Sequence, residues 1–239
     1  MTAPMGLFDR SRPPRAVAAR LHDAEAWAFD WDGTLIDSIG RTLATYRQLL
    51  GEFGIAFDEI DFRANYAPDW RRIYRRVGLA EADWPKADKR WVELYETEVA
   101  GLVDGAAGAL ETLRAAGARV ALVTAGHRAR VELEMRANGV DALFDAVIFG
   151  DEVPHQKPDP APLQLASKYL RVAPGALVLV GDASDDMSMA RRAGVTAVGV
   201  LTGAADGRSL RRGGAHWVAA NAEAAVDAAG HVRAVAAQV

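Results

Sequence analysis

The chain has 239 residues, of which half are hydrophobic and a quarter are charged, with a net charge of −4 and no cysteine. This length allows one full domain with a smaller inserted one. The mild negative charge argues against a nucleic-acid partner, and the absence of cysteine excludes disulfides and thiolate chemistry and is compatible with a cytoplasmic protein.

The first part of the chain, residues 1–24, carries several arginines and a Pro-Pro pair but no apolar segment followed by a cleavage site. It does not resemble a secretory signal, and no apolar run in the chain approaches the roughly 18–20 residues that cross a membrane. We expect a lead-in segment here, partly disordered and partly helical. Its arginines would be solvated or would form a small anion-binding arm; they are Arg10, Arg12, Arg15 and Arg20.

Short apolar runs recur along the rest of the chain, and each ends at a turn or polar residue. They are typical of strands buried on both faces of a parallel sheet. They cover residues 27–31, 119–125, 146–150, 176–181 and 196–200. Helical patterns lie between and after them, at residues 106–116, 128–138, 160–170, 185–193 and about 221–229. This alternation predicts a doubly wound, Rossmann-like α/β core, which binds ligands at the carboxyl ends of its strands.

Residues 40–100 interrupt the alternation, because they contain no valine-rich strand. Amphipathic helical patterns cover residues 41–53 and 84–99, and a short basic and aromatic helix is expected at residues 69–77. We therefore predict a small helical cap domain at residues 40–100, inserted between core segments 25–39 and 101–239. Its linkers, near Ser38 and residues 101–105, are short and rich in small residues, which would let the cap open and close.

Two aspartates end the first predicted strand, in the stretch FDWDGT. Alternate residues of an extended chain point to the same side, so Asp30 and Asp32 can face one small volume. Two carboxylates that share a site repel each other, which favours protonating one of them unless a cation is present. A bound metal, or a division of roles between a nucleophile and an acid, would resolve this conflict. A third acid, Asp37, better fits a helix start at the entrance to the cap.

A second acidic group follows the fourth predicted strand. Asp182 lies at the end of this strand, and Asp185 and Asp186 open the next helix. Alone, the group could be a helix cap with favourable charge in the first turn. Combined with Asp30 and Asp32, it predicts an all-oxygen pocket of the kind that Mg²⁺ prefers.

Two further polar side chains are expected at the same edge. Thr124 ends the second strand before Ala125 and Gly126, where a hydroxyl and backbone amides could cradle an oxyanion or could serve only as a turn or cap. Lys157 lies in a proline-stiffened loop after the third strand, so its ammonium would point in one direction and neutralise carboxylates and phosphate.

These four pieces, in this order, resemble the motifs of the haloacid-dehalogenase superfamily. Residues 29–38 resemble the first motif and Val123-Thr124 the second. Lys157-Pro158 resembles the third motif, and residues 181–186 resemble the fourth. The likeness covers nearly everything after Trp27, and the helical insertion resembles the small cap of the phosphoglycolate-phosphatase-like branch. It implies a Mg²⁺-dependent phosphatase acting on a small phosphorylated metabolite, such as a phosphoglycolate-like compound, a sugar phosphate or a nucleotide.

The resemblance implies a role for each matched residue. Asp30 would be the nucleophile that forms an aspartyl-phosphate, and Asp32 would protonate the leaving oxygen and then activate water. Mg²⁺ would be held by the Asp30 carboxylate, the Asp32 backbone carbonyl and Asp182, with Asp186 acting behind them or through water. The residues expected to bind phosphate are Gly33, Thr124, Ala125 and Lys157.

Some positions depart from the pattern of the superfamily. Its dehalogenases lack the second aspartate of the first motif, so Asp32 argues against dehalogenation and for phosphoryl transfer. Trp31 stands where many relatives have a smaller aliphatic residue, and we expect it to pack into the core. Ala183 replaces the usual serine of the fourth motif, and Ala125 follows Thr124 where relatives often have asparagine or a basic residue, which weakens any borrowed substrate assignment.

The substrate stays open at this point. Cap arginines could recognise a carboxylate or a second phosphate, or could form a solvated helix face. The candidate substrate contacts are Arg72 and Arg75 of the cap and His127 of the core. The cap region also holds Arg63, Tyr66, Trp70, Arg71, Tyr74 and Arg76. The histidines match no zinc-binding spacing. A phosphomutase of the same fold and a phospho-acceptor signalling module are the alternatives; we expect a monomer or homodimer without nucleic-acid or membrane partners.

Overall fold

The computed structural model describes residues 12–65, 70–95 and 99–230. Its strands are β1 (Ala26–Phe29), β2 (Arg119–Val123), β3 (Ala146–Ile148), β4 (Leu177–Gly181), β5 (Thr196–Val200) and β6 (Trp217–Ala219). All of them pair in parallel in one sheet of order β3-β2-β1-β4-β5-β6. The first five strands confirm the predicted runs, whereas β6 was not predicted, because three residues are too few to show a pattern.

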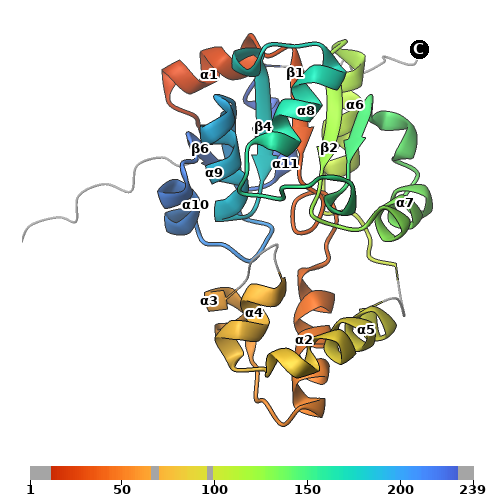
Figure 1. Ribbon diagram of the computed structural model, residues 1–239. Coiled ribbons are helices and arrows are strands. Elements are labelled where there is room, and N and C mark those ends of the chain that lie inside the picture. The colour runs from red at the N-terminus through yellow and green to blue at the C-terminus, as the bar shows by residue number, and fades with distance from the viewer. Residues whose placement is uncertain (1–11, 66–69, 96–98, 231–239) are drawn as a thin grey trace, which may run out of the picture.

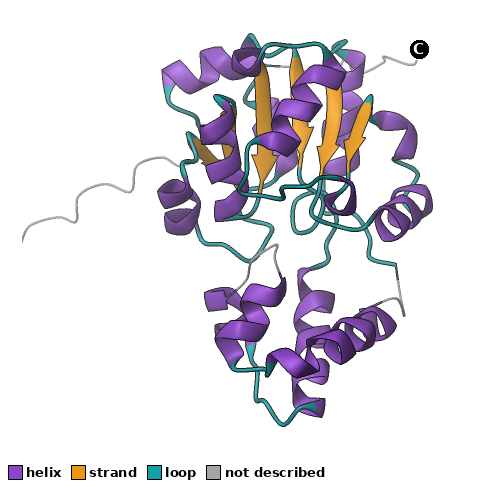
Figure 2. Ribbon diagram, in the orientation of Figure 1, coloured by secondary structure: helices purple, strands orange, loops and turns teal. Residues whose placement is uncertain are grey.

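Helices cover both faces of this sheet (Figures 1 and 2). The core helices are α1 (Arg15–His22), α6 (Ala106–Ala115), α7 (Arg128–Ala137), α8 (Ala161–Leu170), α9 (Ser184–Ala193), α10 (Gly207–Gly213) and α11 (Ala222–Asp227). Single 3-10 turns occur at Glu81–Asp83, Asp141–Leu143, Gly150–Glu152 and Pro174–Ala176. The doubly wound α/β core expected from the sequence is therefore present, with α10 as an additional short helix.

Alternation along the central strand divides the core into two layers. Trp27 and Phe29 of β1 belong to one buried cluster, and Ala26 and Ala28 belong to the cluster on the opposite face. Helix α1 packs into the first of these, where Leu21 is fully buried. The helical part of the lead-in segment was expected; its packing into the core was not, because eight residues with several arginines do not reveal which face is buried.

A separate helical unit follows β1 and forms the cap. It contains α2 (Ile39–Glu52), α3 (Glu59–Asn65), α4 (Trp70–Val77) and α5 (Trp84–Tyr95). These helices share a hydrophobic cluster of their own, which includes Leu49, Phe62 and Ile73. Figure 1 places the cap beyond the carboxyl ends of the strands. The exact limits proposed for the domains remain predictions, and α3 was not anticipated.

The order of the strands brings distant parts of the chain to one edge. β1 lies between β2 and β4, and Phe29 is in register with Leu122 on one side and Val180 on the other. Asp30 follows Phe29 directly, while Thr124 and Asp182 follow the ends of β2 and β4. These side chains therefore emerge together at the edge that faces the cap. In the described part of the chain, no helix has both the length and the apolar character needed to cross a bilayer.

Candidate active site

Three buried carboxylates form the centre of this edge. Oxygen atoms of Asp30, Asp182 and Asp186 all lie within 4.8 Å of one another. Asp182 accepts hydrogen bonds from the Ala204 backbone N–H at 3.3 Å and from the Thr34 hydroxyl at 3.4 Å. Asp186, in the first turn of α9, accepts the backbone N–H of Ala183 at 3.1 Å. The strand ends and these donors hold the carboxylates close together despite their like charge.

Glycine allows the backbone to approach Asp182. At Gly33, where φ is +74°, a Cβ atom would lie 2.7 Å from Asp182 Oδ2, and at Gly203 it would lie only 1.6 Å from that atom. No other residue fits these places without moving the carboxylate. The Gly33 N–H donates to the Ile36 carbonyl at 3.0 Å, so the predicted phosphate-binding role of Gly33 has no support from this geometry.

Lys157 lies between two of the carboxylates. Its Nζ is 2.6 Å from Asp30 Oδ1 and 2.7 Å from Asp186 Oδ1, and the side chain is almost fully buried. Burial by itself would lower the pKa of the lysine, but the carboxylates of Asp186 and Asp30 raise it above its usual range. The ammonium is therefore charged and directed at Asp30 and Asp186; its contact with phosphate stays a prediction.

One lysine does not balance three carboxylates. Burial, and then the neighbouring Asp186, raises the pKa of Asp30 from 3.8 to about 7, although Lys157 opposes this. Burial and the charges of Asp30 and Asp186 likewise raise the pKa of Asp182. A dense set of hard oxygen donors with unbalanced negative charge fits a divalent cation such as Mg²⁺. The residues that would hold it are Asp30, Asp182 and Asp186.

Asp32 has a different environment from Asp30. Arg130 of α7 pairs with it through two contacts, Nη1 to Oδ1 at 3.0 Å and Nη2 to Oδ2 at 2.6 Å. Burial would raise the pKa of Asp32, but Arg130 outweighs it and holds the pKa below its usual value. The carboxylate of Asp32 is outside the cluster of three acids. Any contact with a metal would therefore use its backbone carbonyl, which stays a prediction.

A buried glutamate connects this pair to the rest of the site. Glu134, also on α7, accepts from Arg130 Nη1 at 2.9 Å and from the Trp31 indole N–H at 2.7 Å. Arg41 of the cap helix α2 donates to its other oxygen at 2.6 Å. The guanidinium of Arg41 also lies 3.9 Å from the ring centre of Tyr95, on α5. Asp32 is thus linked through Arg130, Glu134 and Arg41 to the cap helices α2 and α5.

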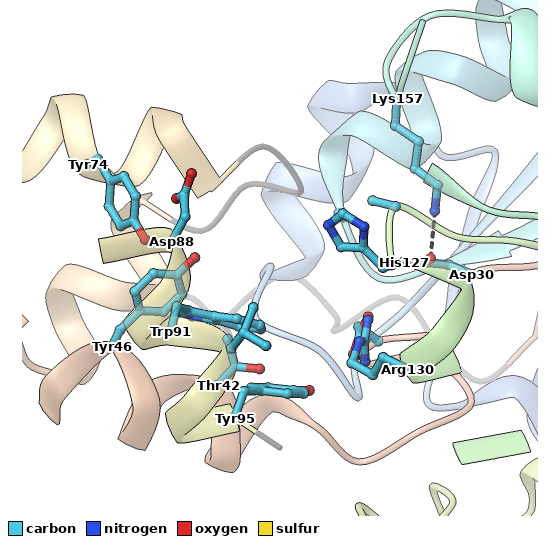
Figure 3. Close-up of a pocket in the computed structure, with 15 residues that line it drawn as sticks. Asp30, Thr42, Tyr46, Tyr74, Asp88, Trp91, Tyr95, His127, Arg130 and Lys157 are labelled. Atoms are coloured by element: carbon cyan, nitrogen blue, oxygen red, sulfur yellow. Dashed lines mark hydrogen bonds and ion pairs between the residues drawn. The ribbon is translucent and has the colours of Figure 1, made fainter. Parts of the chain in front are cut away.

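Thr124 and the two residues after it form the turn that follows β2. The Thr124 hydroxyl accepts the backbone N–H of Gly126 at 2.9 Å, which tightens the turn after β2. Ala125 and Gly126 line a cavity of about 190 Å³ that lies between core and cap. Asp30, Asp32 and Lys157 line the same cavity (Figure 3). Residues of the first, third and fourth motifs therefore line one cavity, since Ala183 lines it too, whereas the second motif reaches it through the two residues that follow Thr124.

The predicted substrate contacts divide into three cases. His127 lines the cavity, with its side chain 63% exposed and Nδ1 3.5 Å from an oxygen of Asp151. Arg75 does not line the cavity; its guanidinium lies 5.3 Å from the ring centre of Trp84. The side chain of Arg72 is outside the described part of the structure. Asp37 is exposed just before α2, away from the acid cluster, as expected.

Several residues of the site were not predicted. Arg41, Arg130 and Glu134 had no motif to mark them. A single indirect signal was available: Trp31, buried among apolar residues, needs an acceptor for its indole N–H, and Glu134 supplies it. Of the aromatic lining contributed by the cap, Tyr46, Trp91 and Tyr95 were also missed, because the helical pattern does not distinguish rings that face the cap core from rings that face a cavity.

Comparison with known proteins agrees with the geometry. Residues 28–200 match the family model for haloacid dehalogenase-like hydrolases. The phosphoglycolate phosphatase of Nitrosospira multiformis is 32% identical over 197 residues, covering 78% of this chain and 87% of the relative. Pyrophosphatase PpaX of Bacillus velezensis is 28% identical over 180 residues, covering 72% and 81%. The crystal structure of a hydrolase from Pseudomonas syringae aligns with a TM-score of 0.75 at 25% identity, covering 85% of this chain and 96% of that one.

The chain belongs to the haloacid dehalogenase-like hydrolases. Within that family it falls in the phosphoglycolate-phosphatase-like branch, and the enzyme is a phosphatase of this type. The recognition of the superfamily from the four motifs is confirmed.

Proposed function

We propose that the protein hydrolyses a small phosphomonoester through an aspartyl-phosphate on Asp30, with a divalent cation, Mg²⁺ by preference, in the acid cluster. The observation that carries the proposal is the position of Asp30. It is the one described carboxylate that belongs to the acid cluster, contacts Lys157 and lines the cavity. A nucleophile needs this combination of access to substrate and charge balance.

In the first step, an oxygen of Asp30 attacks phosphorus and the bond to the leaving oxygen breaks. Asp32 gives its proton to that oxygen, so the leaving group departs as a neutral alcohol. Lys157 and Thr124 contact the phosphoryl oxygens as they pass between the two partners. Mg²⁺, when bound, would supply the positive charge that keeps Asp30 ionised and neutralises the phosphoryl group.

In the second step, water attacks the aspartyl-phosphate and the bond to Asp30 breaks, releasing inorganic phosphate. Asp32 takes the proton from this water and returns to its starting form. The pair with Arg130 suits the ionised Asp32 that must act as base here. Because the same pair opposes protonation, Arg130 has to release Asp32 before the first step.

The test is release of phosphate from para-nitrophenyl phosphate with and without Mg²⁺. We expect hydrolysis that requires the metal and falls by about a thousandfold or more in Asp30→Asn, which removes the nucleophilic oxygen. Mass spectrometry of rapidly quenched enzyme should find phosphate on the peptide that contains Asp30. Full activity in Asp30→Asn would refute the mechanism.

Asp37→Asn is the matched control, since Asp37 lies in the same segment but is exposed and away from the acid cluster. Its activity should equal that of the wild type. Formation of an isomeric sugar phosphate without net release of phosphate would instead identify a phosphomutase, and an aspartyl-phosphate that lasts for many minutes without turnover would identify a signalling module.

A further inference from the structure

The cap side of the cavity is built mainly from aromatic rings. Trp91 and Tyr95 of α5 stack with ring centres 4.3 Å apart and an angle of 14° between their planes. Tyr46 of α2 leans against Trp91 at 6.2 Å, and Tyr74 of α4 lies further along the same wall. Helices α2, α4 and α5 thus line one chamber, which we call the cap chamber, with Tyr46, Tyr74, Asp88, Trp91 and Tyr95.

Two polar groups of the cap chamber, the Tyr74 hydroxyl and the Asp88 carboxylate, lie at its far end. Figure 3 shows Tyr74 and Asp88 together at the side remote from Asp30 and Lys157. Burial and the adjacent Asp88 carboxylate raise the pKa of the Tyr74 hydroxyl, so this group stays a neutral donor. The indole N–H of Trp91 is buried and has no hydrogen-bond partner among the residues that the structure describes. A bound molecule could satisfy it.

The described cap residues that line the cavity carry one charged side chain, the carboxylate of Asp88. Arg71 approaches Asp88 with an N–O distance of 3.9 Å but is not part of the lining. The two strong cations of the cavity, Lys157 and Arg130, are at the core end and are held by the site's own acids. A carboxylate or second phosphate would therefore meet rings and an acid in the cap chamber.

We propose that the cap chamber binds a leaving group that contains an uncharged or cationic aromatic ring, with its hydrogen-bonding or amino end directed at Asp88. Ring faces attract both flat apolar groups and cations, and a carboxylate adds attraction for an amine. This inference rests on the proposed phosphatase function and narrows its substrates to phosphomonoesters of ring-bearing alcohols. Phosphoglycolate and pyrophosphate, which give two of the relatives their names, have leaving groups that are anions without an aromatic ring.

The experiment compares esters that differ only at the end remote from phosphate. They are benzyl phosphate, para-aminomethyl-benzyl phosphate and para-carboxybenzyl phosphate, with phosphoglycolate as the small anionic ester. We expect kcat/KM to be highest for the aminomethyl ester and lower for benzyl phosphate. For the carboxybenzyl ester and for phosphoglycolate, kcat/KM should be at least about tenfold lower than for the aminomethyl ester.

Variants assign the preference to the cap chamber. Asp88→Asn should bring the amine down to the level of benzyl phosphate, and Trp91→Leu should lower kcat/KM for all three benzyl esters by about tenfold more than for glycerol phosphate. The control is Glu93→Gln, also on α5, whose exposed side chain pairs with Arg90 outside the cavity. It should keep the wild-type order and rates. Far-UV circular dichroism checks that each variant folds.

The possible failures are distinguishable. If phosphoglycolate or the carboxybenzyl ester is the better substrate, or if Asp88→Asn leaves the order of the esters unchanged, the inference is wrong while the phosphatase function stands. If neither these esters nor para-nitrophenyl phosphate is hydrolysed with Mg²⁺, the proposed function itself fails and the inference falls with it.

Discussion

The two ends of the cavity differ in the forces they offer a substrate. At the core end, Asp30, Asp182, Asp186 and Lys157 place buried charges within a few ångströms of one another. At the cap end, the wall consists of rings, with Asp88 as the acid among the described lining residues. Charge suits a phosphoryl group, which is the same in every substrate, whereas ring surface suits the part that varies. The difference supports the proposal that the core carries out the reaction and the cap selects the leaving group.

The two ends also differ in how they are held. The charged groups follow adjacent strands of one sheet, so their spacing is set by the sheet register. The rings lie on helices with their own hydrophobic cluster. Movement of this unit as a body on its two linkers stays a prediction. Arg41 connects the two units, since it pairs with Glu134 of the core and lies over Tyr95 of the cap.

The largest effect should come from removing the buried cation of the core end. Lys157→Met leaves Asp30 and Asp186 without their ion pair and removes the contact proposed for the phosphoryl group. We expect kcat with para-nitrophenyl phosphate to fall by about a hundredfold to a thousandfold. In metal-free protein, we also expect the free energy of unfolding to fall by about 3 kcal/mol, measured with urea.

Lys168→Met is the control for this change, because Lys168 is exposed on α8. It should alter neither quantity. If Lys157→Met kept the wild-type kcat, the charged end of the cavity would not be the reacting end, and the contrast between the two ends would lose its functional meaning.

The core end could be predicted from the sequence because each of its residues follows a strand. Chain order gives the strands, and a parallel sheet brings their carboxyl ends to one edge, so Asp30, Thr124 and Asp182 could be placed together without coordinates. The position of Lys157 was predicted in the same way, because its loop follows β3. The orientation of each side chain and its burial could not be predicted, since both depend on contacts made by loops.

Helix α7 shows why other site residues were not found. Arg128 and Glu132 pair at 2.7 Å on the exposed side of this helix, and Arg130 and Glu134 pair at 2.9 Å with the same spacing. Only the second pair is in the site, where Glu134 is 2% exposed. Nothing in the local sequence separates the two pairs, because the distinction comes from the packing of α7 against Trp31 and the cap.

Arg130→Gln should have the next largest effect. Without the guanidinium, Asp32 loses the interaction that keeps its pKa low, so it retains its proton to a higher pH. The alkaline limb of kcat/KM, where the proton donor is lost, should move upward in pH, and the rate should fall by about tenfold to a hundredfold because Asp32 is no longer positioned. A pH profile with benzyl phosphate, whose leaving oxygen needs the proton from Asp32, measures both.

Arg136→Gln provides the comparison on the same helix, because Arg136 is 58% exposed and pairs only loosely with Glu132, at 3.5 Å. Its profile should coincide with that of the wild type. A drop in rate for Arg130→Gln with no movement of the limb would show that Arg130 supports the fold and does not set the protonation of Asp32.

A smaller effect is expected for the dependence of metal binding on pH. The pKa of Asp30 is raised in the folded protein from 3.8 to about 7, so its contribution to stability is present below pH 3.8 and is lost as pH rises toward 7. Mg²⁺ binds the ionised carboxylates, so it should raise the Tm more at about pH 8 than at about pH 5, by roughly 5 °C at saturation. Calorimetry with Mg²⁺ and with a chelator measures this. Equal shifts at both pH values, or an unchanged shift in Asp182→Asn, would contradict a metal at the acid cluster.

The smallest effect is expected at Arg75, which the sequence offered as a substrate contact. The structure places it outside the cavity lining, exposed, with its guanidinium over the ring of Trp84. Arg75→Gln should therefore leave kcat/KM within about twofold of the wild type for every ester, and should lower the free energy of unfolding by at most about 1 kcal/mol through the lost contact with Trp84. Kinetics with benzyl phosphate and phosphoglycolate, run beside urea unfolding, provide the check. A loss of tenfold or more for phosphoglycolate alone would show that Arg75 contributes a positive charge at the cap end of the cavity. The aromatic rings of the cap chamber would then not determine which leaving groups bind there.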